Sequence, residues 1–445
     1  MKRIMCVILF VSMLLTVSGC KNVEKDPDAI EYTLSKDKTY YILSYVGENI
    51  EELVIPEYYN GKPVLEIGKY ACYQKKDPHS FNNSKLKSVK IEAKLTKIGN
   101  SAFDECSFLE TINIPPTVTE IGEGAFSQCE SLKSIDIPTG VTRINRSLFY
   151  NCKELDSIKL HDHIERIDSY AFHGCSSIDE IILPENVKWI GENAFSMMES
   201  LKSIHIPEGN KYYVTVDGNL YTKDQKTLMQ YAPASETENF TLPDRVKTIN
   251  SYAFAGSSTV KSVSIPRGVT ELPQHVFRNC TSLKEIHLHN QITKIDYAAF
   301  SGCTALETIR IPESVTEIGG YAFSECASLK EINLPSNLSE LPYALFNDCT
   351  SLETVSIPEG IEKIDFLTFS TCSSLKSVYI PSSVKKIGHG AFSGCRSLSD
   401  IHFGGNMNEW KSVDGIYGVF GNKKDDWCYG SGDFIIHCTD GDVKK

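Results

Sequence analysis

The sequence predicts a curved α/β solenoid, in which short coils stack into one long parallel β-sheet backed by helical turns and irregular connections. The first observation behind this prediction is a phenylalanine that recurs every 23 residues. The first run is Phe103, Phe126, Phe149, Phe172 and Phe195, and the second is Phe254, Phe277, Phe300, Phe323, Phe346, Phe369 and Phe392. Such a period is typical of solenoids, because each unit is too small to bury its own apolar face and must stack on its neighbours.

The second observation is the pattern within one unit, for which residues 306–328 are an example. Ile309 begins an alternation of apolar and polar residues, which predicts a short strand with one buried face. Pro312 cannot donate a hydrogen bond to a neighbouring strand, so we expect the strand to end there. The following V-T-x-I-G segment turns the chain inward. Phe323 and Cys326 then share one side of a short helical turn.

The third observation is the spacing of the central apolar residue of each strand, which we call the anchor. The fifteen anchors are Leu53, Val89, Ile112, Ile135, Ile158, Ile181, Ile204, Phe240, Val263, Ile286, Ile309, Ile332, Val355, Val378 and Ile401. Successive anchors are 23 residues apart, except for two steps of 36 residues after Leu53 and Ile204. The extra residues predict loops that bulge from coils whose ends stay in register. About fifteen rungs at roughly 4.8 Å each make a sheet about 70 Å long.

The consensus I-P-x-x-V-T-x-I-G-x-x-A-F-x-x-C resembles the 23-residue repeat of the BspA-like, Treponema-type leucine-rich repeat proteins, and the match covers about residues 50–404. The resemblance implies a curved leucine-rich repeat solenoid that is used for binding, often for adhesion to host proteins or to other bacteria. It brings no catalytic residues. The chain departs from the consensus at Cys72 in a phenylalanine position, at Leu341-Pro342 in place of I-G, and at Met198 and Ser257 in the cysteine position.

The N-terminus indicates an exported protein. Two basic residues precede an apolar stretch from residue 4 to 17, which is too short to span a bilayer comfortably and is typical of a secretory signal. The stretch ends in V-S-G-C, which resembles the bacterial lipobox and implies a lipidated N-terminal Cys20. The alternative is a plain signal peptide with a chance cysteine. We therefore expect a signal peptide at 1–19 and a lipidated, charged tether at 20–29.

Composition agrees with a water-exposed body. Without residues 1–19, 43 basic residues against 57 acidic ones leave a net charge of about −14. This acidic balance argues against nucleic acid as a partner and against spreading on anionic lipid. The sequence has no other long apolar run, so we expect the N-terminal lipid to be its only membrane contact. Repetition makes the chain one elongated domain with caps.

Ten cysteines occupy the same position of the repeat. They are Cys106, Cys129, Cys152, Cys175, Cys280, Cys303, Cys326, Cys349, Cys372 and Cys395. Stacked rungs place such side chains parallel and about 4.8 Å apart, whereas a disulfide brings its Cβ atoms to about 3.8 Å. We expect reduced thiols that pack as small apolar groups. A zinc ladder is not expected, because no histidine keeps the same register.

Both ends of the solenoid expose apolar edges and need caps. Residues 30–50 contain two alternating stretches around a polar turn, which predicts an N-terminal hairpin cap. Residues 405–445 leave the repeat and supply apolar side chains that can close the other end, namely Trp410, Trp427, Phe434 and Ile436. If the chain has one disulfide, we expect it between Cys428 and Cys438 in this cap.

Leucine-rich repeat proteins usually bind partners through the solvent-facing side chains of their strands. Equivalent side chains of successive strands form columns along the sheet. Two residues before the anchors, charges of opposite sign nearly alternate from coil to coil, as at Lys87 after Glu51 and Lys330 after Glu307. This column is either a charged ligand surface or a ladder of ion pairs between rungs, and we favour the ladder. The column after the anchors is irregular and is the better candidate for recognition. Its candidate residues are His205, His287, Arg310, Asn333, Tyr379 and His402.

Two histidine pairs, His161 with His163 and His287 with His289, could in principle bind a metal ion. No Cys, Asp or Glu completes a metal site at matching spacing, so we interpret them as solvated surface and expect no metal.

The long coil at about 207–240 contains a second candidate surface. Asp217-Gly218 lies between alternating stretches, which is a strong hairpin signal, and a second turn is expected at residues 223–226. Tyrosines that protrude from such hairpins are suited to recognition, because they are large, fairly rigid and amphipathic. The candidates here are Tyr212, Tyr213 and Tyr221, while Tyr231 follows nearby. The alternative is that two or three of these rings pack on the coil beneath.

No catalytic motif is present, so we expect no enzyme and no cofactor. Two non-enzymatic functions remain. In the first, the chain is a lipid-anchored adhesion or binding module for an extracellular protein or glycan. It is then exposed on the outer side of the membrane in a bacterial envelope. In the second, it is a structural envelope component that contacts copies of itself or the cell wall. We expect a monomer with the solenoid at 51–404 between the caps at 30–50 and 405–445.

Overall fold

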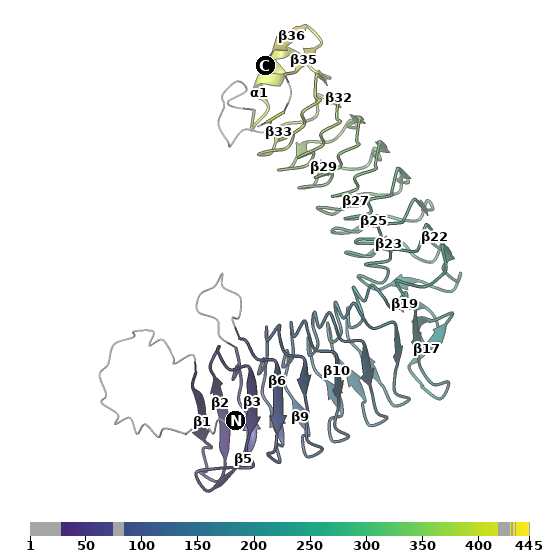
Figure 1. Ribbon diagram of the computed structural model, residues 1–445. Coiled ribbons are helices and arrows are strands. Elements are labelled where there is room, and N and C mark those ends of the chain that lie inside the picture. The colour runs from purple at the N-terminus through teal and green to yellow at the C-terminus, as the bar shows by residue number, and fades with distance from the viewer. Residues whose placement is uncertain (1–27, 74–83, 417–427, 429, 432, 445) are drawn as a thin grey trace.

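The computed structural model describes residues 28–73, 84–416, 428, 430, 431 and 433–444. These residues form a solenoid of about fifteen turns with parallel sheets and almost no helix, which confirms the predicted fold class. Figure 1 shows the stack as an open arc, with the N-terminal coils in purple at one end and the C-terminal coils in yellow at the other. The signal peptide, Cys20 and the first part of the tether lie outside the described residues.

The anchors lie on a first ladder of parallel strands that pair 23 residues apart, for example Ile135 with Ile158. The strands of this ladder are β3 (Glu52–Ile55), β6 (Ser88–Ile91), β8 (Thr111–Ile112), β10 (Ser134–Asp136), β12 (Ser157–Lys159), β14 (Glu180–Ile182), β16 (Ser203–His205), β20 (Asn239–Thr241), β22 (Ser262–Ser264), β24 (Glu285–His287), β26 (Thr308–Arg310), β28 (Glu331–Asn333), β30 (Thr354–Ser356), β32 (Ser377–Ile380) and β34 (Asp400–Phe403). The ladder is divided into shorter sheets, so neighbouring coils are not hydrogen-bonded through this face at every step.

Each coil from that of β3 to that of β32 also carries a second short strand, which the sequence did not predict. These strands are β5 (Lys62–Ile67), β7 (Lys97–Ile98), β9 (Glu120–Ile121), β11 (Arg143–Ile144), β13 (Arg166–Ile167), β15 (Trp189–Ile190), β19 (Thr227–Gln230), β21 (Thr248–Ile249), β23 (Glu271–Leu272), β25 (Lys294–Ile295), β27 (Glu317–Ile318), β29 (Glu340–Leu341), β31 (Lys363–Ile364) and β33 (Lys386–Ile387). Most contain two residues, too few for a visible alternation of apolar and polar side chains. They come from the V-T-x-I-G segment and form a second parallel ladder.

The A-F-x-x-C segment forms hydrogen-bonded turns where the sequence predicted a helical turn. In one coil the Cys326 N–H donates to the Phe323 carbonyl at 3.3 Å, while the Phe323 N–H donates to the Leu345 carbonyl of the next coil at 3.0 Å. Tyr321 and Glu325 have left-handed φ angles of 56° and 61°. These residues interrupt the run of helical φ angles and let the segment bond to the next coil instead of continuing as a helix.

The phenylalanine column forms the centre of the core. Rings in neighbouring coils are stacked with centroids 4.9–5.9 Å apart, and all of them are buried. None of the ten ladder cysteines is in a disulfide. From Cys129 onward each ladder thiol donates to a phenylalanine carbonyl of the preceding coil at 3.1–3.3 Å. Burial raises the pKa of Cys326 to about 12. The thiols are core groups, as predicted.

The long coil after β16 contains two hairpins. β17 (Tyr213–Val216) and β18 (Asn219–Thr222) are antiparallel around Asp217 and Gly218, whose φ angles of 49° and 75° fit a tight hairpin turn. β18 then pairs antiparallel with β19, which joins the second ladder beside β21. This insertion therefore becomes part of the stack, and β17 and β19 lie where the arc changes direction in Figure 1.

Both ends of the stack are covered by β-structure. β1 (Ile30–Leu34) and β2 (Tyr41–Val46) form an antiparallel pair that continues the second ladder through β5, to which β4 (Tyr58–Tyr59) is also paired. At the other end, α1 (Met407–Ser412) follows β34. β35 (Ile435–Cys438) adds to β34 in parallel and pairs with β36 (Gly441–Lys444). Trp410, Phe434 and Ile436 are buried there, and Trp427 lies outside the described residues.

The disulfide expected between Cys428 and Cys438 is not formed, because the thiol of Cys438 is free. Cys438 lies at the end of β35 and is half-buried, opposite Gly441 of the terminal hairpin. Cys428 is buried near Cys395, the last ladder cysteine: burial raises the pKa of Cys395 to about 12, and the neighbouring Cys428 adds to the rise. The two residues therefore pack in different parts of the cap.

Candidate binding surfaces

The charged column of the first ladder forms ion pairs between coils. The pairs and their N–O distances are Lys87–Glu51 2.8 Å, Lys202–Asp179 3.3 Å, Lys261–Glu238 2.6 Å, Lys330–Glu307 2.8 Å and Lys376–Glu353 2.7 Å. All of these side chains are well exposed, so each pair contributes little to stability. The ion-pair ladder agrees with the favoured interpretation of this column as stabilising.

The irregular column beside it does not gather its candidate residues into one site. Arg310 and Asn333 are neighbours in register and line a shallow hollow with Glu331. Tyr379 and His402 are likewise neighbours, two coils further on. His287 lies on β24, one coil before Arg310, whereas His205 lies on β16, further from both pairs.

Most of these candidates are held by contacts within the chain. His205 Nε2 lies 3.1 Å from a carboxylate oxygen of Glu180, and His287 lies 3.6 Å from that of Glu285. Asn333 donates to the Ile311 carbonyl at 3.0 Å and accepts from the Ile311 N–H at 3.3 Å. Tyr379 donates to Glu359 at 3.1 Å, and His402 stacks on His437 with centroids 4.9 Å apart. A binding role for this column stays a prediction.

In each histidine pair, one imidazole contacts a proline carbonyl. His161 and His289 each place Nε2 2.9 Å from a proline carbonyl of the preceding coil, Pro138 and Pro266 respectively. Within the part of the chain that the structure describes, no group of three or more His, Cys, Asp or Glu residues could hold a metal ion.

Three of the four hairpin tyrosines are buried, so the prediction of protruding rings holds only for Tyr212. Tyr212 is 48% exposed, whereas Tyr213 is 7% and Tyr221 is 2% exposed, and Tyr231 is fully buried. The Tyr213 hydroxyl accepts a hydrogen bond from the Ile190 N–H at 2.9 Å. Tyr231 stacks on Phe254 with centroids 4.9 Å apart and takes the place of a phenylalanine in its coil. These rings pack on the coils beside them because the hairpins lie within the stack.

A surface that the sequence interpretation missed runs along the turn side of the solenoid. We call it the aromatic strip, and it consists of Tyr150, Tyr170, His173, Tyr252, His275, Tyr297, Tyr321, Tyr343 and Phe366. Each ring lies 4.4–6.3 Å from the next along the strip. Most of these side chains are half-buried, and Phe366 is 43% exposed. The strip is therefore continuous and open to solvent.

The backbone under the strip has a left-handed φ angle at one position of every regular coil, from Ser101 to Gly390. Tyr170, Tyr252 and Tyr321 have left-handed φ angles of 56–60°. Gly124 and Gly390 occupy the equivalent position of other coils with the same left-handed φ. Glycine adopts this conformation freely, whereas a residue with a side chain loses roughly 1–2 kcal/mol there. Because the left-handed turn recurs in every regular coil, it belongs to the repeat and does not by itself indicate a role for the rings.

The two histidines of the strip are uncharged at neutral pH. The pKa of His173 is lowered to about 4, mainly by burial and in addition by the nearby Arg278 guanidinium. The same two causes, in the same order, lower the pKa of His275 to about 4. Both imidazoles therefore act as neutral aromatic rings between the tyrosines, and the strip has little charge of its own.

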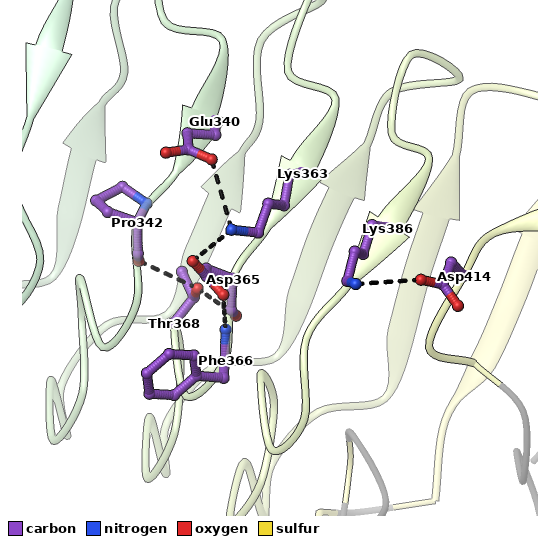
Figure 2. Close-up of polar contacts among 8 residues, drawn as sticks. All are labelled: Glu340, Pro342, Lys363, Asp365, Phe366, Thr368, Lys386 and Asp414. Carbon is purple, nitrogen blue, oxygen red and sulfur yellow. Dashed lines mark hydrogen bonds and ion pairs between the residues drawn. The ribbon is translucent and has the colours of Figure 1, made fainter.

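The second ladder carries a separate set of charges beside the strip. Aspartate replaces the consensus glycine after the strand at Asp168, Asp296 and Asp365. Figure 2 shows the arrangement at Asp365, where Lys363 lies between two carboxylates, 2.6 Å from Asp365 and 3.6 Å from Glu340. Asp365 also accepts the Phe366 N–H at 2.8 Å, which fixes the start of the turn that presents the Phe366 ring. The aspartate thus positions one end of the strip.

Known proteins similar to the chain share its repeat. The family described as BspA type leucine rich repeat region, with six copies, matches residues 74–182, 96–215, 230–349 and 293–413. No curated protein matches the sequence.

Several solved structures have the same fold. A leucine rich cell surface protein from Faecalibacterium prausnitzii is 28% identical, with a TM-score of 0.54 over 88% of this chain and 97% of that one. A leucine-rich repeat protein from Eubacterium ventriosum is 25% identical, with a TM-score of 0.50 over 83% and 87%. The pneumococcal vaccine antigen PcpA is 19% identical, with a TM-score of 0.61 over 92% and 98%, and shows the fold alone.

Proposed function

The chain belongs to the BspA-type leucine-rich repeat family of bacterial proteins, and from this premise we propose that it is a cell-surface binding module that docks an extracellular protein on its aromatic strip. The observation that carries the proposal is the continuous run of rings from Tyr150 to Phe366. Leucine-rich repeat solenoids of this family are generally not enzymes. A binding function also agrees with a surface that is built by repetition and varies from coil to coil.

A protein partner fits the chemistry of the strip. Tyrosine, phenylalanine and arginine are enriched where proteins bind one another, because they combine large apolar area with few rotatable bonds and a polar end. The strip supplies tyrosine hydroxyls and ring faces, with Arg278 beside His173 and His275. The net charge of −12 for the whole chain opposes nucleic acid, whose phosphates would be repelled.

The docking proposal is tested by site-specific photo-crosslinking. Benzoylphenylalanine is introduced at Tyr343, in the strip, or at Tyr58, which is 59% exposed and lies outside it. Each protein is mixed with solubilised extracellular matrix from cultured epithelial cells or with purified bacterial cell wall. We expect a discrete crosslinked polypeptide from the matrix at Tyr343 and none at Tyr58. Crosslinks between two copies, or to wall components, would support the structural-envelope alternative.

Affinity measurements locate the surface independently. The double variant Tyr321→Ser with Tyr343→Ser should weaken binding to the crosslinked partner by about tenfold or more, because a few aromatic residues usually carry most of an interface. Arg310→Ala with Tyr379→Ala removes the largest candidates from the strand column. A loss with this second pair and none with the first would place the partner on the first ladder instead.

We also propose that the protein is held at the outer side of the membrane by lipid on Cys20. The similar protein from F. prausnitzii is described as a cell surface protein. Among the described residues, no helix is long and apolar enough to cross a membrane. Cys20→Ala should abolish labelling by radioactive palmitate and release the protein to the medium or leave its signal uncleaved. Unchanged labelling and membrane association in that variant would exclude the lipid anchor.

A further inference from the structure

Two arginines of the second ladder share one buried carboxylate. Arg143 on β11 contacts Asp168 through Nε at 2.6 Å and Nη2 at 2.5 Å, and Arg166 on β13 contacts it through Nε at 2.5 Å. The Asp168 side chain is 6% exposed, while the two arginine side chains are 49% and 46% exposed. A guanidinium has five N–H donors, so the carboxylate fixes both groups and leaves most donors of Arg166 available.

The other coils with the same aspartate show that this arrangement is unusual within the chain. At Asp365 a single lysine lies between two carboxylates, as described above for Lys363. At Asp296 the same holds, because Lys294 lies 3.6 Å from Asp296 and 2.9 Å from Glu317. At Asp168 the proportion is reversed, with two cations on one carboxylate. Holding the aspartate does not require the second arginine, so the excess positive charge needs another explanation.

A third arginine converges on the same place. Glu123, Arg143, Arg146, Arg166, Asp168 and Ser169 line a small surface cavity of about 160 Å³. Among the described residues, no acidic group lies within 4.0 Å of the Arg146 guanidinium. Three arginines therefore face two acidic residues around a cavity that is large enough for one small anionic group.

Two aromatic rings lie beside arginines that line this cavity. Trp189 follows Arg166 in register on β15, and its ring lies 5.3 Å from the Arg166 guanidinium carbon. Trp189 is nevertheless 52% exposed, so much of its ring stays open to solvent. The Arg146 guanidinium carbon lies 6.0 Å from the centre of the Tyr170 ring. An apolar, flat surface is thus available next to the guanidinium donors.

We propose that this cavity binds the carboxylate of an acidic sugar, with the sugar ring packed on Trp189. Arginine N–H donors match the two oxygens of a carboxylate, and the C–H face of a pyranose matches an exposed aromatic ring. Glu123 in the cavity wall and the net charge of −12 disfavour polymers and peptides with a high density of negative charge. A sugar with a single carboxylate carries one negative charge, which matches the excess of one positive charge among the residues that line the cavity. This ligand site adjoins the aromatic strip at Tyr170, but it does not depend on the proposed protein-docking role of the strip.

The test measures binding of 3′-sialyllactose to the full chain by isothermal titration calorimetry, with lactose as the matched sugar without the carboxylate. We expect sialyllactose to bind and lactose not to bind. Arg146→Gln leaves the Asp168 contacts in place and should weaken sialyllactose binding by about tenfold. Trp189→Ala should also weaken it. Lys294→Gln removes one positive charge from the same column of another coil and should change nothing.

Three results would overturn the proposal. The first is equal binding of lactose and sialyllactose, and the second is unchanged binding in Arg146→Gln. The third is equal or tighter binding of an aspartate-rich peptide or of sulfated lactose, which would mean a general anion site. The photo-crosslinking experiment at Tyr343 uses a protein partner and is independent of the sugar titration. A negative titration therefore does not affect the protein-docking proposal. A negative crosslinking result likewise does not affect the sugar-binding proposal.

Discussion

At the scale of single residues, the position of a ring in the coil decides what it contributes. The phenylalanine column is buried and stacked, whereas the aromatic strip places similar rings within a few residues of it at the surface. Phe300 and Phe366 are the clearest contrast, because the first is fully buried and the second is 43% exposed. Identical residue types are therefore buried in one column and exposed to solvent in the other.

The first prediction compares these two phenylalanines. Phe300→Ala should lower the free energy of unfolding by about 3–5 kcal/mol, because it leaves a cavity between two stacked rings. Phe366→Ala removes a ring of the same size and should cost about 1 kcal/mol or less, since much of that ring is already in water. Urea denaturation followed by circular dichroism measures both. Similar losses in the two variants would contradict the assignment of Phe366 to the surface.

The second prediction concerns the two histidines of the strip. The pKa values of His173 and His275 are about 4 in the folded chain, against an ordinary value of 6.5 in the unfolded one. Between these values the unfolded state binds more protons, so stability falls as pH decreases from about 6.5 to about 4. The double variant His173→Gln with His275→Gln should lose less stability than the wild type between about pH 7 and pH 5.

Thermal unfolding at the two pH values measures this difference. His437 acts in the opposite direction in both proteins, because hydrogen bonds to Asp400 and Asp442 raise its pKa and favour the protonated form at low pH. The comparison between wild type and variant removes that contribution. The same pH dependence in both proteins would show that the strip histidines are not buried.

At the scale of elements, the hairpin insertion is tied to the ladder that it interrupts. The Tyr213 hydroxyl accepts the N–H of Ile190, the last residue of β15, and the tyrosine ring is 7% exposed. Tyr213→Phe should cost about 1–3 kcal/mol, because it leaves a buried N–H without an acceptor. Tyr212→Phe is the matched control and should cost almost nothing, since Tyr212 is 48% exposed. Hydrogen exchange of the Ile190 amide measures the local effect and should become faster only in Tyr213→Phe.

How much of each element can be predicted from sequence depends on its length and on its repetition. The first ladder is predictable because its anchors recur with an apolar alternation that spans several residues. The second ladder is not, because strands such as Lys97–Ile98 contain two residues and have no period. The turns that bear Tyr321 and Glu325 are also missed, since left-handed φ angles at residues other than glycine have no sequence signature.

The candidate surfaces show the same limit. The sequence identifies variable positions beside the anchors, but not that Asn333 bonds to the Ile311 backbone or that Tyr221 is buried. The aromatic strip draws its rings from three different positions around the phenylalanine, so no single column displays it. A count of aromatic residues within three positions of each repeat phenylalanine would have found Tyr297, Tyr343 and Phe366.

At the scale of the whole molecule, the solenoid has two cores. The buried apolar residues of the described chain fall into two clusters, one ending at Leu220 and the other beginning at Tyr221. The boundary lies inside β18, in the middle of the hairpin insertion. In a solenoid each coil is stabilised only by its neighbours, so a break in the apolar contacts weakens the coupling between the two halves.

The last prediction is that the two halves unfold in separate steps. Phe126 lies in the N-terminal cluster and Phe323 in the C-terminal one, and both are fully buried and stacked on both sides. Phe126→Ala should destabilise its own half by about 3–5 kcal/mol and leave the other half nearly unchanged, and Phe323→Ala should do the reverse. Hydrogen-exchange mass spectrometry in intermediate urea assigns each transition to its coils. A single transition that both variants shift equally would show that the insertion transmits stability across the boundary, because β18 contributes Leu220 to one cluster and Tyr221 to the other.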